Sequence, residues 1–304
     1  MILVTGSAGF IGSCLVNELV KNYKVVGIDD LSSGSKKNII KHKNYVFIKG
    51  NCGDLNLLSS IKKIRVIIHL AGQTSGANSF EDPLNDFNKN TQSTLNLLYY
   101  AVKIKCKHFI FTSSMSVYGN KYNIKLNEKF STSPISFYGL SKETSEKYIK
   151  KYRDKGLNYT ILRLFNVYGS EQKLGNLKQG MIRIYLTQIF KNKSLIIKGS
   201  GKRYRDFVHI RDVLDYIKII INNKKYFNQI FNIGTGEKNT VNSLVNLIQK
   251  KIDFNFKIKF IGGTKDDQFG RVANVNKIIK LSKIKPKISL DEGLNEMIKN
   301  IKRK

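Results

Sequence analysis

The first residues in this sequence that suggest chemistry are a tyrosine and a lysine spaced four positions apart. Tyr138 and Lys142 belong to the run Tyr-Gly-Leu-Ser-Lys, inside a segment, 136–152, that has the pattern of a long helix. Positions four apart lie on one face of a helix. A lysine cation near a phenol favours the phenolate and lowers the pKa of the tyrosine, so the pair predicts that Tyr138 is a general base.

The spacing by itself also fits an ordinary amphipathic surface helix, so the neighbouring segments decide between the two interpretations. An apolar run over 108–112 predicts a buried strand, and a serine-rich stretch, 113–119, follows it directly. The chain also opens with a glycine pattern of the kind that binds nucleotides. This combination favours the catalytic interpretation.

The glycine pattern lies between an apolar run and a helical periodicity. The run Ile-Leu-Val at 2–4 stops at Gly6, glycines recur at Gly9 and Gly12, and a helical pattern follows. Gly6 permits a tight turn, Gly9 lets the backbone approach a pyrophosphate, and Gly12 lets helix and strand pack closely. The helix would present unpaired N–H groups and a positive dipole end to the phosphates.

An acidic residue at the end of the second apolar run supports a dinucleotide site. The run over 24–28 ends in Asp29, where such units place an acid to hold the ribose 2′-hydroxyl. A carboxylate would repel a 2′-phosphate, so Asp29 favours NAD over NADP. Lys36 and Lys37 follow closely and leave NADP open as an alternative.

Composition narrows the class of protein. The chain has 304 residues, 41% hydrophobic and 25% charged, which is typical of a globular protein with one large domain or two smaller ones. We expect no transmembrane segment and no signal peptide, because the first apolar run ends in the glycine turn. Three cysteines without ligand spacing predict a reduced, cytoplasmic protein with no metal site.

The formal net charge of +31 raises the question of a nucleic-acid partner. The lysines are scattered along the whole chain, and there is no arginine-rich arm, no Cys/His finger and no aromatic RNA-binding signature. A compositional bias explains the charge better than a dedicated patch does. We therefore expect no specific nucleic-acid partner, with non-specific polyanion binding as a minor alternative.

The alternation of strands and helices predicts an α/β fold, a doubly wound parallel (Rossmann) sheet with a smaller C-terminal α/β substrate lobe. We expect an NAD-binding domain over 1–165, to which 204–233 returns, and a substrate lobe over 166–203 and 234–304. The tail from 240 should hold two helical stretches around one short strand. The other expected strands are 45–48, 66–70, 108–112, 159–164 and 230–233, and the expected helices are 90–102, 136–152 and 210–221.

The sequence resembles the extended short-chain dehydrogenase/reductases of the nucleotide-sugar epimerase and dehydratase family, most of all their UDP-hexose 4-epimerases. The resemblance runs nearly from end to end of the chain. The matching blocks are Thr5–Gly12, Asp29, His69–Gly72, Asn90, Ser113–Gly119, Tyr138–Lys142, Arg163–Gly169, Gly199–Val208 and Asn232–Gly236.

The resemblance implies roles for the residues of these blocks. Tyr138 would be the base, Lys142 would orient the nicotinamide ribose, and Ser114 would share the proton with the sugar hydroxyl. Asn51 and Cys52 would flank the adenine, where the family more often has Asp followed by an aliphatic residue. The implied NAD contacts are Gly6, Gly9, Phe10, Ile11, Gly12, Asp29, Asn51, Cys52, Leu70, Ala71, Gly72, Asn90, Ser113, Tyr138, Lys142 and Phe165.

Four residues are implied to contact the nucleotide-sugar substrate, and one block departs from the family pattern. Ser114 would meet the sugar, Asn166 the phosphates, and Arg205 would clamp the diphosphate, a task that suits a bidentate guanidinium. Relatives commonly read Arg-Pro-Gly-Asp near the C-terminus, whereas 264–267 reads Thr-Lys-Asp-Asp and keeps only Asp267. The position that often gates sugar size falls near Arg271.

The leading hypothesis for the reaction is NAD-dependent epimerisation of a nucleotide sugar at C4, with UDP-glucose and UDP-galactose or their N-acetyl forms as substrates. The alternatives are a 4,6-dehydratase or decarboxylase, a 4-ketosugar reductase, and a sensor without activity. In the dehydratases that the chain resembles, an Asp-Glu pair follows the active-site hydroxyl residue; here those positions are Met115 and Ser116. The resemblance also implies a homodimer through the helices around 90–102 and 136–152.

Overall fold

Continuous apolar runs build the central sheet of this protein. The computed structural model describes all residues except 122, 173–179, 264–268 and 303–304. Strands buried on both faces of a parallel sheet read as uninterrupted hydrophobic runs, and five of the central strands are buried at every residue. The strands are β1 (Ile2–Thr5), β2 (Val25–Asp29), β3 (Tyr45–Lys49), β4 (Val66–His69), β5 (His108–Ser114), β7 (Tyr159–Leu164) and β12 (Gln229–Ile233).

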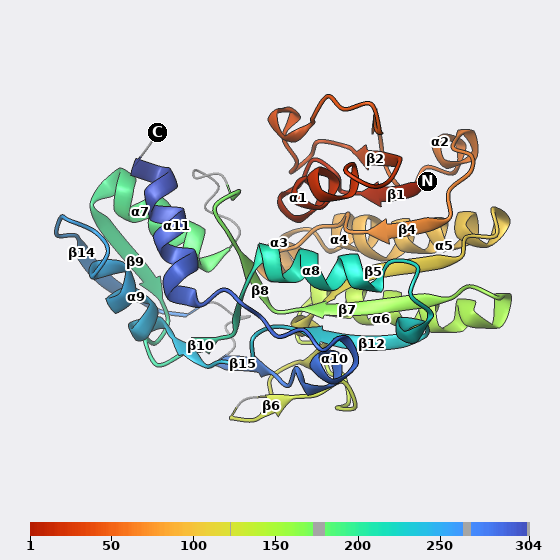
Figure 1. Cartoon of the computed structure of the whole chain (residues 1–304). Helices are drawn as coiled ribbons and strands as arrows, with labels where there is room; N and C mark the ends of the chain where they lie inside the picture. Colours follow the sequence, from red (N-terminus) through yellow and green to blue (C-terminus); the bar gives the residue numbers. More distant parts are fainter. Residues whose placement is uncertain (122, 173–179, 264–268, 303–304) are drawn as a thin grey trace. The chain divides into compact units, whose positions relative to one another are not determined.

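The strand order confirms the doubly wound fold. The seven strands lie in the order β12-β7-β5-β4-β1-β2-β3 (Figure 1), and β1 pairs in parallel with both β2 and β4. Ile2 is in register with Val25 on one side and Val66 on the other. The order therefore reverses between β1 and β4, and open α/β sheets bind ligands outside the carboxyl ends of their strands at such a switch point.

The chain divides into two compact units, and each consists of several segments. Unit 1 comprises Met1–Val117, Ser136–Arg163 and Tyr216–Phe231, and unit 2 comprises Tyr118–Ile135, Leu164–Asp215 and Asn232–Lys304. The core of unit 1 lies around Leu3, Ile67 and Phe109. The helices of unit 1 are α1 (Phe10–Leu19), α2 (Leu55–Ser60), α3 (Gly76–Glu81), α4 (Pro83–Phe87), α5 (Ser93–Lys103) and α6 (Phe137–Tyr152), and α8 (Ile210–Ile220) begins in unit 2 and ends in unit 1.

Unit 2 has more regular structure than the sequence predicted. Its core gathers around Leu186, Leu244 and Leu294. We expected mainly loops after 166 and a tail with two helical stretches around one strand, but strands of two to five residues show too little periodicity to be recognised. The elements are β6 (Lys125–Leu126), β8 (Asn166–Tyr168), α7 (Met181–Asn192), β9 (Ser194–Lys198), β10 (Tyr204–Arg205), β11 (Phe207–His209), β13 (Asn239–Thr240), α9 (Val241–Gln249), β14 (Lys257–Ile261), β15 (Gly270–Ala273), α10 (Asn276–Ser282) and α11 (Leu290–Lys302).

Candidate active site

The glycine turn between β1 and α1 leaves backbone N–H groups available to an anion. Gly6 adopts a φ of 68°, and its N–H donates to the Ile28 carbonyl at 2.8 Å. A Cβ on Gly12 would clash with the Gly6 carbonyl, so the helix can approach the turn only because residue 12 is a glycine. Gly9 caps α1 without any side-chain hydrogen bond. The first turn of α1 is therefore suited to a phosphate group.

Asp29 lies at the carboxyl end of β2, beside this turn. Its Oδ2 accepts a hydrogen bond from the Ala8 N–H at 2.9 Å, and its Oδ1 accepts one from the Leu31 N–H at 2.8 Å. A carboxylate offers about four acceptor positions, so both oxygens can still accept a ribose hydroxyl. Gly34 keeps this approach open, since a Cβ there would lie 2.7 Å from Oδ1.

A buried acceptor without a partner lies after β4, next to Gly72. Asn90 is fully buried in a π-helical turn (Asn88–Gln92), a distortion that is frequent at functional sites. Its Nδ2 donates to the Gln73 carbonyl and to Asp86, but within the described residues its Oδ1 has no hydrogen-bond partner. A Cβ on Gly72 would clash with this oxygen. A ligand hydroxyl would satisfy Oδ1, which fits the ribose of a dinucleotide.

Asn51 and Cys52, the predicted adenine neighbours, follow β3. The exposed Asn51 accepts the Gly53 N–H with its Oδ1 at 2.8 Å, and this closes the turn. Cys52 is buried, and burial raises the pKa of its thiol to about 12. A neutral thiol is a suitable apolar neighbour for a base. Together with the glycine turn, Asp29 and Asn90, these contacts fit a dinucleotide.

The three predicted catalytic residues come together in unit 1. Ser114 ends β5, and its hydroxyl is hydrogen-bonded to the phenol of Tyr138 on α6. Lys142 lies one turn further along α6 and donates from Nζ to the Thr112 carbonyl at 3.2 Å. Its Nζ is 5.9 Å from the centroid of the Tyr138 ring. Helical spacing alone places Tyr138 beside Lys142, whereas the packing of α6 against β5 brings Ser114 to them, as the family resemblance implied.

The electrostatics of this cluster differ from the sequence-based expectation. Burial raises the pKa of Tyr138 to about 12, although the hydrogen bond from Ser114 opposes this shift. Burial also lowers the pKa of Lys142 to about 8, against the opposing effect of Asp86. The prediction that Lys142 brings the pKa of Tyr138 down is therefore wrong in direction for this arrangement. Desolvation of the phenolate is the largest cause of the raised pKa, and the negative charge of Asp86 adds to it.

Asp86, which the sequence analysis did not single out, is a buried carboxylate beside the cluster. Its buried carboxylate accepts hydrogen bonds from Ser141 at 2.7 Å and from Asn90 and Gln73 at 3.0 Å each. It thus ties α6, which carries Tyr138, to the segment that holds the orphan oxygen of Asn90. The four-residue spacing of Asp86 and Asn90 was the only local signal of this contact.

A buried ion pair anchors α6, the helix that carries Tyr138 and Lys142. Glu146, four residues after Lys142 on α6, accepts two hydrogen bonds from Arg163 on β7, at 2.9 and 2.7 Å. Glu146 also accepts the Ser113 hydroxyl at 2.6 Å. Both charged side chains are at most 3% exposed. These contacts fix α6 against β5 and β7. No local sequence pattern predicts them, because Ser113 and Arg163 lie on separate strands.

The predicted substrate residues Asn166 and Arg205 lie in unit 2. The N–H and Nδ2 of Asn166 both donate to the Asp206 carbonyl, at 3.1 and 3.0 Å, so Asn166 lies beside the strand of Arg205. Arg205 is in register with Arg271 on β15. Phe165 is buried in the same unit, whereas Asp267 lies outside the described residues.

Arg271 is a buried cation beside Arg205. Its guanidinium donates to the Gly119 carbonyl at 2.9 and 3.0 Å. Burial, together with the charge of Arg205, lowers the pKa of Arg271 to about 9. A bound anion would offset both the desolvation of Arg271 and its repulsion by Arg205, because the anion would pair with both guanidiniums.

The described part of the chain has neither a metal cluster nor a membrane-spanning helix. No group of three or more His, Cys, Asp or Glu side chains is arranged to hold a metal ion there. Among the helices described, none has the length and apolar character needed to cross a membrane.

Comparisons with known proteins agree on one family. The model of the NAD dependent epimerase/dehydratase family matches residues 2–234. The putative UDP-glucose 4-epimerase of Methanocaldococcus jannaschii is 37% identical over 98% of this chain and 97% of its own. The UDP-glucose 4-epimerase of Thermotoga maritima, solved with UDP-glucose, has a TM-score of 0.93 and 32% identity over 99% and 98% of the two chains. The UDP-glucuronic acid 4-epimerase of Bacillus cereus, solved with UDP-glucuronic acid and NAD, has a TM-score of 0.91 and 29% identity over 99% of both chains.

Proposed function

The chain belongs to the NAD dependent epimerase/dehydratase family, and from this premise we propose that it epimerises a UDP-hexose at C4 through a transient 4-keto sugar. The observation that carries the proposal is the buried cluster of Ser114, Tyr138 and Lys142, together with the residues that follow Ser114. UDP-glucose and UDP-galactose are the first substrates to test, followed by their N-acetyl forms.

The residues of unit 1 would divide the acid–base work. When bound, NAD⁺ supplies a hydride acceptor and a positive charge. Tyr138, as phenolate, takes the proton of the sugar 4-hydroxyl directly or through Ser114, and returns it when the keto group is reduced. Lys142 holds positive charge near the phenolate, which a buried tyrosine with a pKa of about 12 requires. The glycine turn between β1 and α1, together with Asp29 and Asn90, would bind the dinucleotide.

Met115 and Ser116 favour the epimerase over a lyase. Elimination of water across C5 and C6 needs groups that remove a proton from C5 and protonate the C6 hydroxyl. Methionine cannot transfer a proton, and a serine hydroxyl is a poor acid or base without activation. The Ser116 N–H donates to the Ser114 hydroxyl at 3.1 Å, so this segment helps to orient Ser114. The groups for oxidation at C4 are present, whereas those for elimination are missing at these positions.

Unit 2 would hold the diphosphate of the substrate. Arg205 and Arg271 lie in register, and Asn166 is anchored to the neighbouring Asp206 backbone. Two adjacent guanidiniums match the charge of a diphosphate, and one of them, Arg271, is buried. We propose that Arg205 and Arg271 bind the diphosphate together with Asn166.

The products of a panel of nucleotide sugars test the reaction class. We expect the chain, supplied with NAD⁺, to interconvert UDP-glucose and UDP-galactose without a change of mass and without net NADH. Mass spectrometry and NMR of the products would measure this. A product lighter by one water would assign the chain to the lyases instead. Net consumption of NADH or NADPH with a 4-keto sugar would make it a reductase.

We also propose that the chain forms a homodimer through helices α5 and α6 of unit 1, together with α3 and α4, which pack against α6. Helices α3 to α6 expose large apolar side chains, and Phe80 contacts Phe137 edge to face across α3 and α6. Exposed apolar side chains gathered on neighbouring helices are typical of a protein interface. The exposed residues are Phe80, Leu84, Phe87, Tyr99, Phe137, Leu140 and Tyr148.

Analytical sedimentation of the native chain should give twice the mass of one chain. The variant Tyr99→Glu should sediment as a monomer, because it places a charge in the apolar interface. A monomeric native chain would refute the proposal.

The cellular compartment is proposed from the cysteines alone. Cys14, Cys52 and Cys106 are all buried, and none of them takes part in a disulfide. Cysteines without disulfides are typical of reducing compartments, so we propose a cytoplasmic enzyme.

A further inference from the structure

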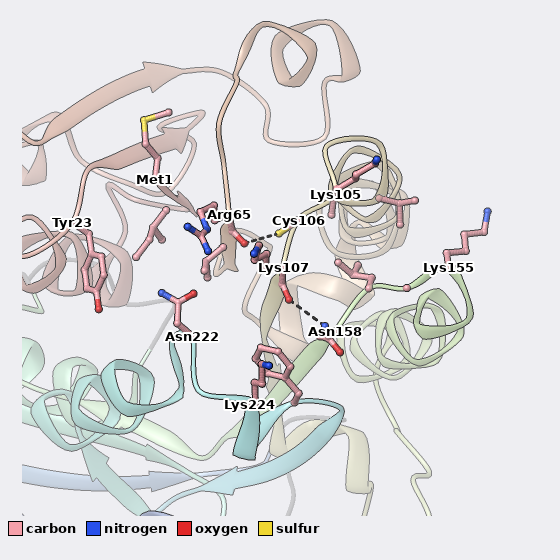
Figure 2. A pocket seen from close by; sticks show the side chains of 17 residues that line it. Met1, Tyr23, Arg65, Lys105, Cys106, Lys107, Lys155, Asn158, Asn222 and Lys224 are labelled. Atoms are coloured by element: carbon pink, nitrogen blue, oxygen red, sulfur yellow. Dashed lines mark hydrogen bonds between the residues drawn. The ribbon is translucent and has the colours of Figure 1, made fainter.

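A cavity of about 850 Å³ lies in unit 1 at the amino ends of the central strands (Figure 2). Its lining includes the residues that immediately precede β4, β5 and β7, namely Arg65, Lys107 and Asn158. The catalytic Ser114 lies at the opposite end of β5, seven residues from Lys107, or about 23 Å at 3.3 Å per residue. This amino-edge pocket is therefore separate from the proposed NAD-binding and catalytic residues of unit 1.

The charged side chains that line the pocket are all positive. Five of the lining residues are cationic and none is acidic, and no ion pair joins any of the five to a carboxylate within the described residues. Helices α5, α6 and α8 end at this edge, and each contributes roughly half a negative charge. These dipoles neutralise only part of the five positive charges. The cations are Arg65, Lys105, Lys107, Lys155 and Lys224.

The central part of the pocket is held in place by the sheet backbone. The Arg65 N–H donates to the Met1 carbonyl at 3.0 Å, and the Arg65 carbonyl accepts the Lys107 N–H at 2.9 Å. The Cys106 thiol donates to the same carbonyl, and Asn158 donates to the Lys107 carbonyl, as Figure 2 shows. Arg65 and Lys107 are therefore exposed side chains on a fixed backbone, so a ligand would not have to order a loop.

The walls of the pocket are apolar as well as basic. Met1, Val102 and Phe227 contribute partly exposed hydrophobic surface, and Tyr23 adds a hydroxyl group, whereas Ile2, Val66 and Leu157 close the floor of the pocket and are almost fully buried. Figure 2 shows Tyr23 at the edge opposite Lys155. The volume lies within the range of small-molecule sites, which combine an apolar lining with a few charged groups. The combination fits an organic body with anionic substituents better than a bare inorganic ion.

We propose that the amino-edge pocket binds an organic molecule that carries two or more phosphate groups. Arg65 and Lys107 bind the phosphates at the centre of the pocket, and the apolar wall contacts the organic part. The site is independent of the epimerase reaction. The scattered lysines of a chain with net charge +31 attract anions everywhere, so the experiment must separate this pocket from general attraction.

The experiment is a calorimetric titration of ATP into the full chain, already saturated with NAD⁺ and UDP so that these two ligands occupy the proposed nucleotide sites. We expect one further ATP to bind per chain. The double variant Arg65→Glu with Lys107→Glu should weaken this binding by about tenfold or more, because charge-assisted contacts are lost and reversed. The matched control, Lys41→Glu with Lys43→Glu, alters two exposed lysines outside the pocket and changes the net charge equally. It should stay within about twofold of the native chain.

Each other result has a definite meaning. Equal weakening in both double variants, or no ATP binding to the saturated chain, would overturn the proposal. Adenosine binding as tightly as ATP would also overturn it, because the phosphates would then be irrelevant. Thermal melting of both variants verifies that they are folded. A failure of the epimerase proposal would appear in the sugar panel, while ATP binding in this titration would be unaffected.

Discussion

Tyr138→Phe is expected to reduce turnover by roughly 10² to 10⁴-fold, the usual contribution of a general acid–base residue. The phenol is buried and hydrogen-bonded to Ser114, and phenylalanine keeps the ring while removing the group that carries the proton. NAD⁺ binding should persist, because the glycine turn, Asp29 and Asn90 are unchanged. Steady-state epimerisation of UDP-galactose measures the first effect, and NAD⁺ titration the second.

The matched control for this variant is Tyr100→Phe. Tyr100 is also buried in unit 1, and its hydroxyl donates to the Ile61 carbonyl at 2.9 Å, away from the catalytic cluster. Removing that hydroxyl should cost about 1 kcal/mol of unfolding free energy and leave turnover nearly intact. If Tyr138→Phe retained near-native turnover, the assignment of Tyr138 as the base would have to be abandoned.

Arg163→Met is expected to lower the free energy of unfolding by about 3 to 5 kcal/mol. The substitution leaves Glu146 as a buried carboxylate without its bidentate partner, and among the described residues Ser113 alone still donates to it. Because Glu146 lies on α6 four residues after Lys142, the loss should also loosen the helix that carries the catalytic pair. Urea denaturation followed by circular dichroism would measure the change.

The control for the ion pair is the double variant Arg163→Met with Glu146→Leu. Replacing both partners of a buried pair by apolar residues of similar size is often close to neutral, so the double variant should recover much of the lost stability. Arg211→Met breaks an ion pair with Glu296 whose side chains are about half and one-third exposed, and it should cost less than about 1 kcal/mol. A loss of that small size in Arg163→Met would contradict the inferred role of the pair.

The sequence by itself determined the nucleotide-binding half of the site. The order of apolar run, glycine turn, helix and acid over residues 2–29 is local, and short-range sterics dictate it: the structure shows the positive φ of Gly6 and the close packing at Gly12. The pairing of Tyr138 with Lys142 is equally local, because helical periodicity places them on one face. The resemblance to the family supplied the order of the remaining blocks.

Only the tertiary structure decided which distant side chains support this site and in which direction the pKa of its buried groups is shifted. Asp86 meets Ser141, and Glu146 meets Arg163, through contacts that no local periodicity encodes. The pKa of Tyr138 rises because the fold buries it, an effect that depends on surrounding volume rather than on spacing along the helix. The amino-edge pocket arises in the same way, since parallel strands bring Arg65 and Lys107 to one edge from different parts of the chain.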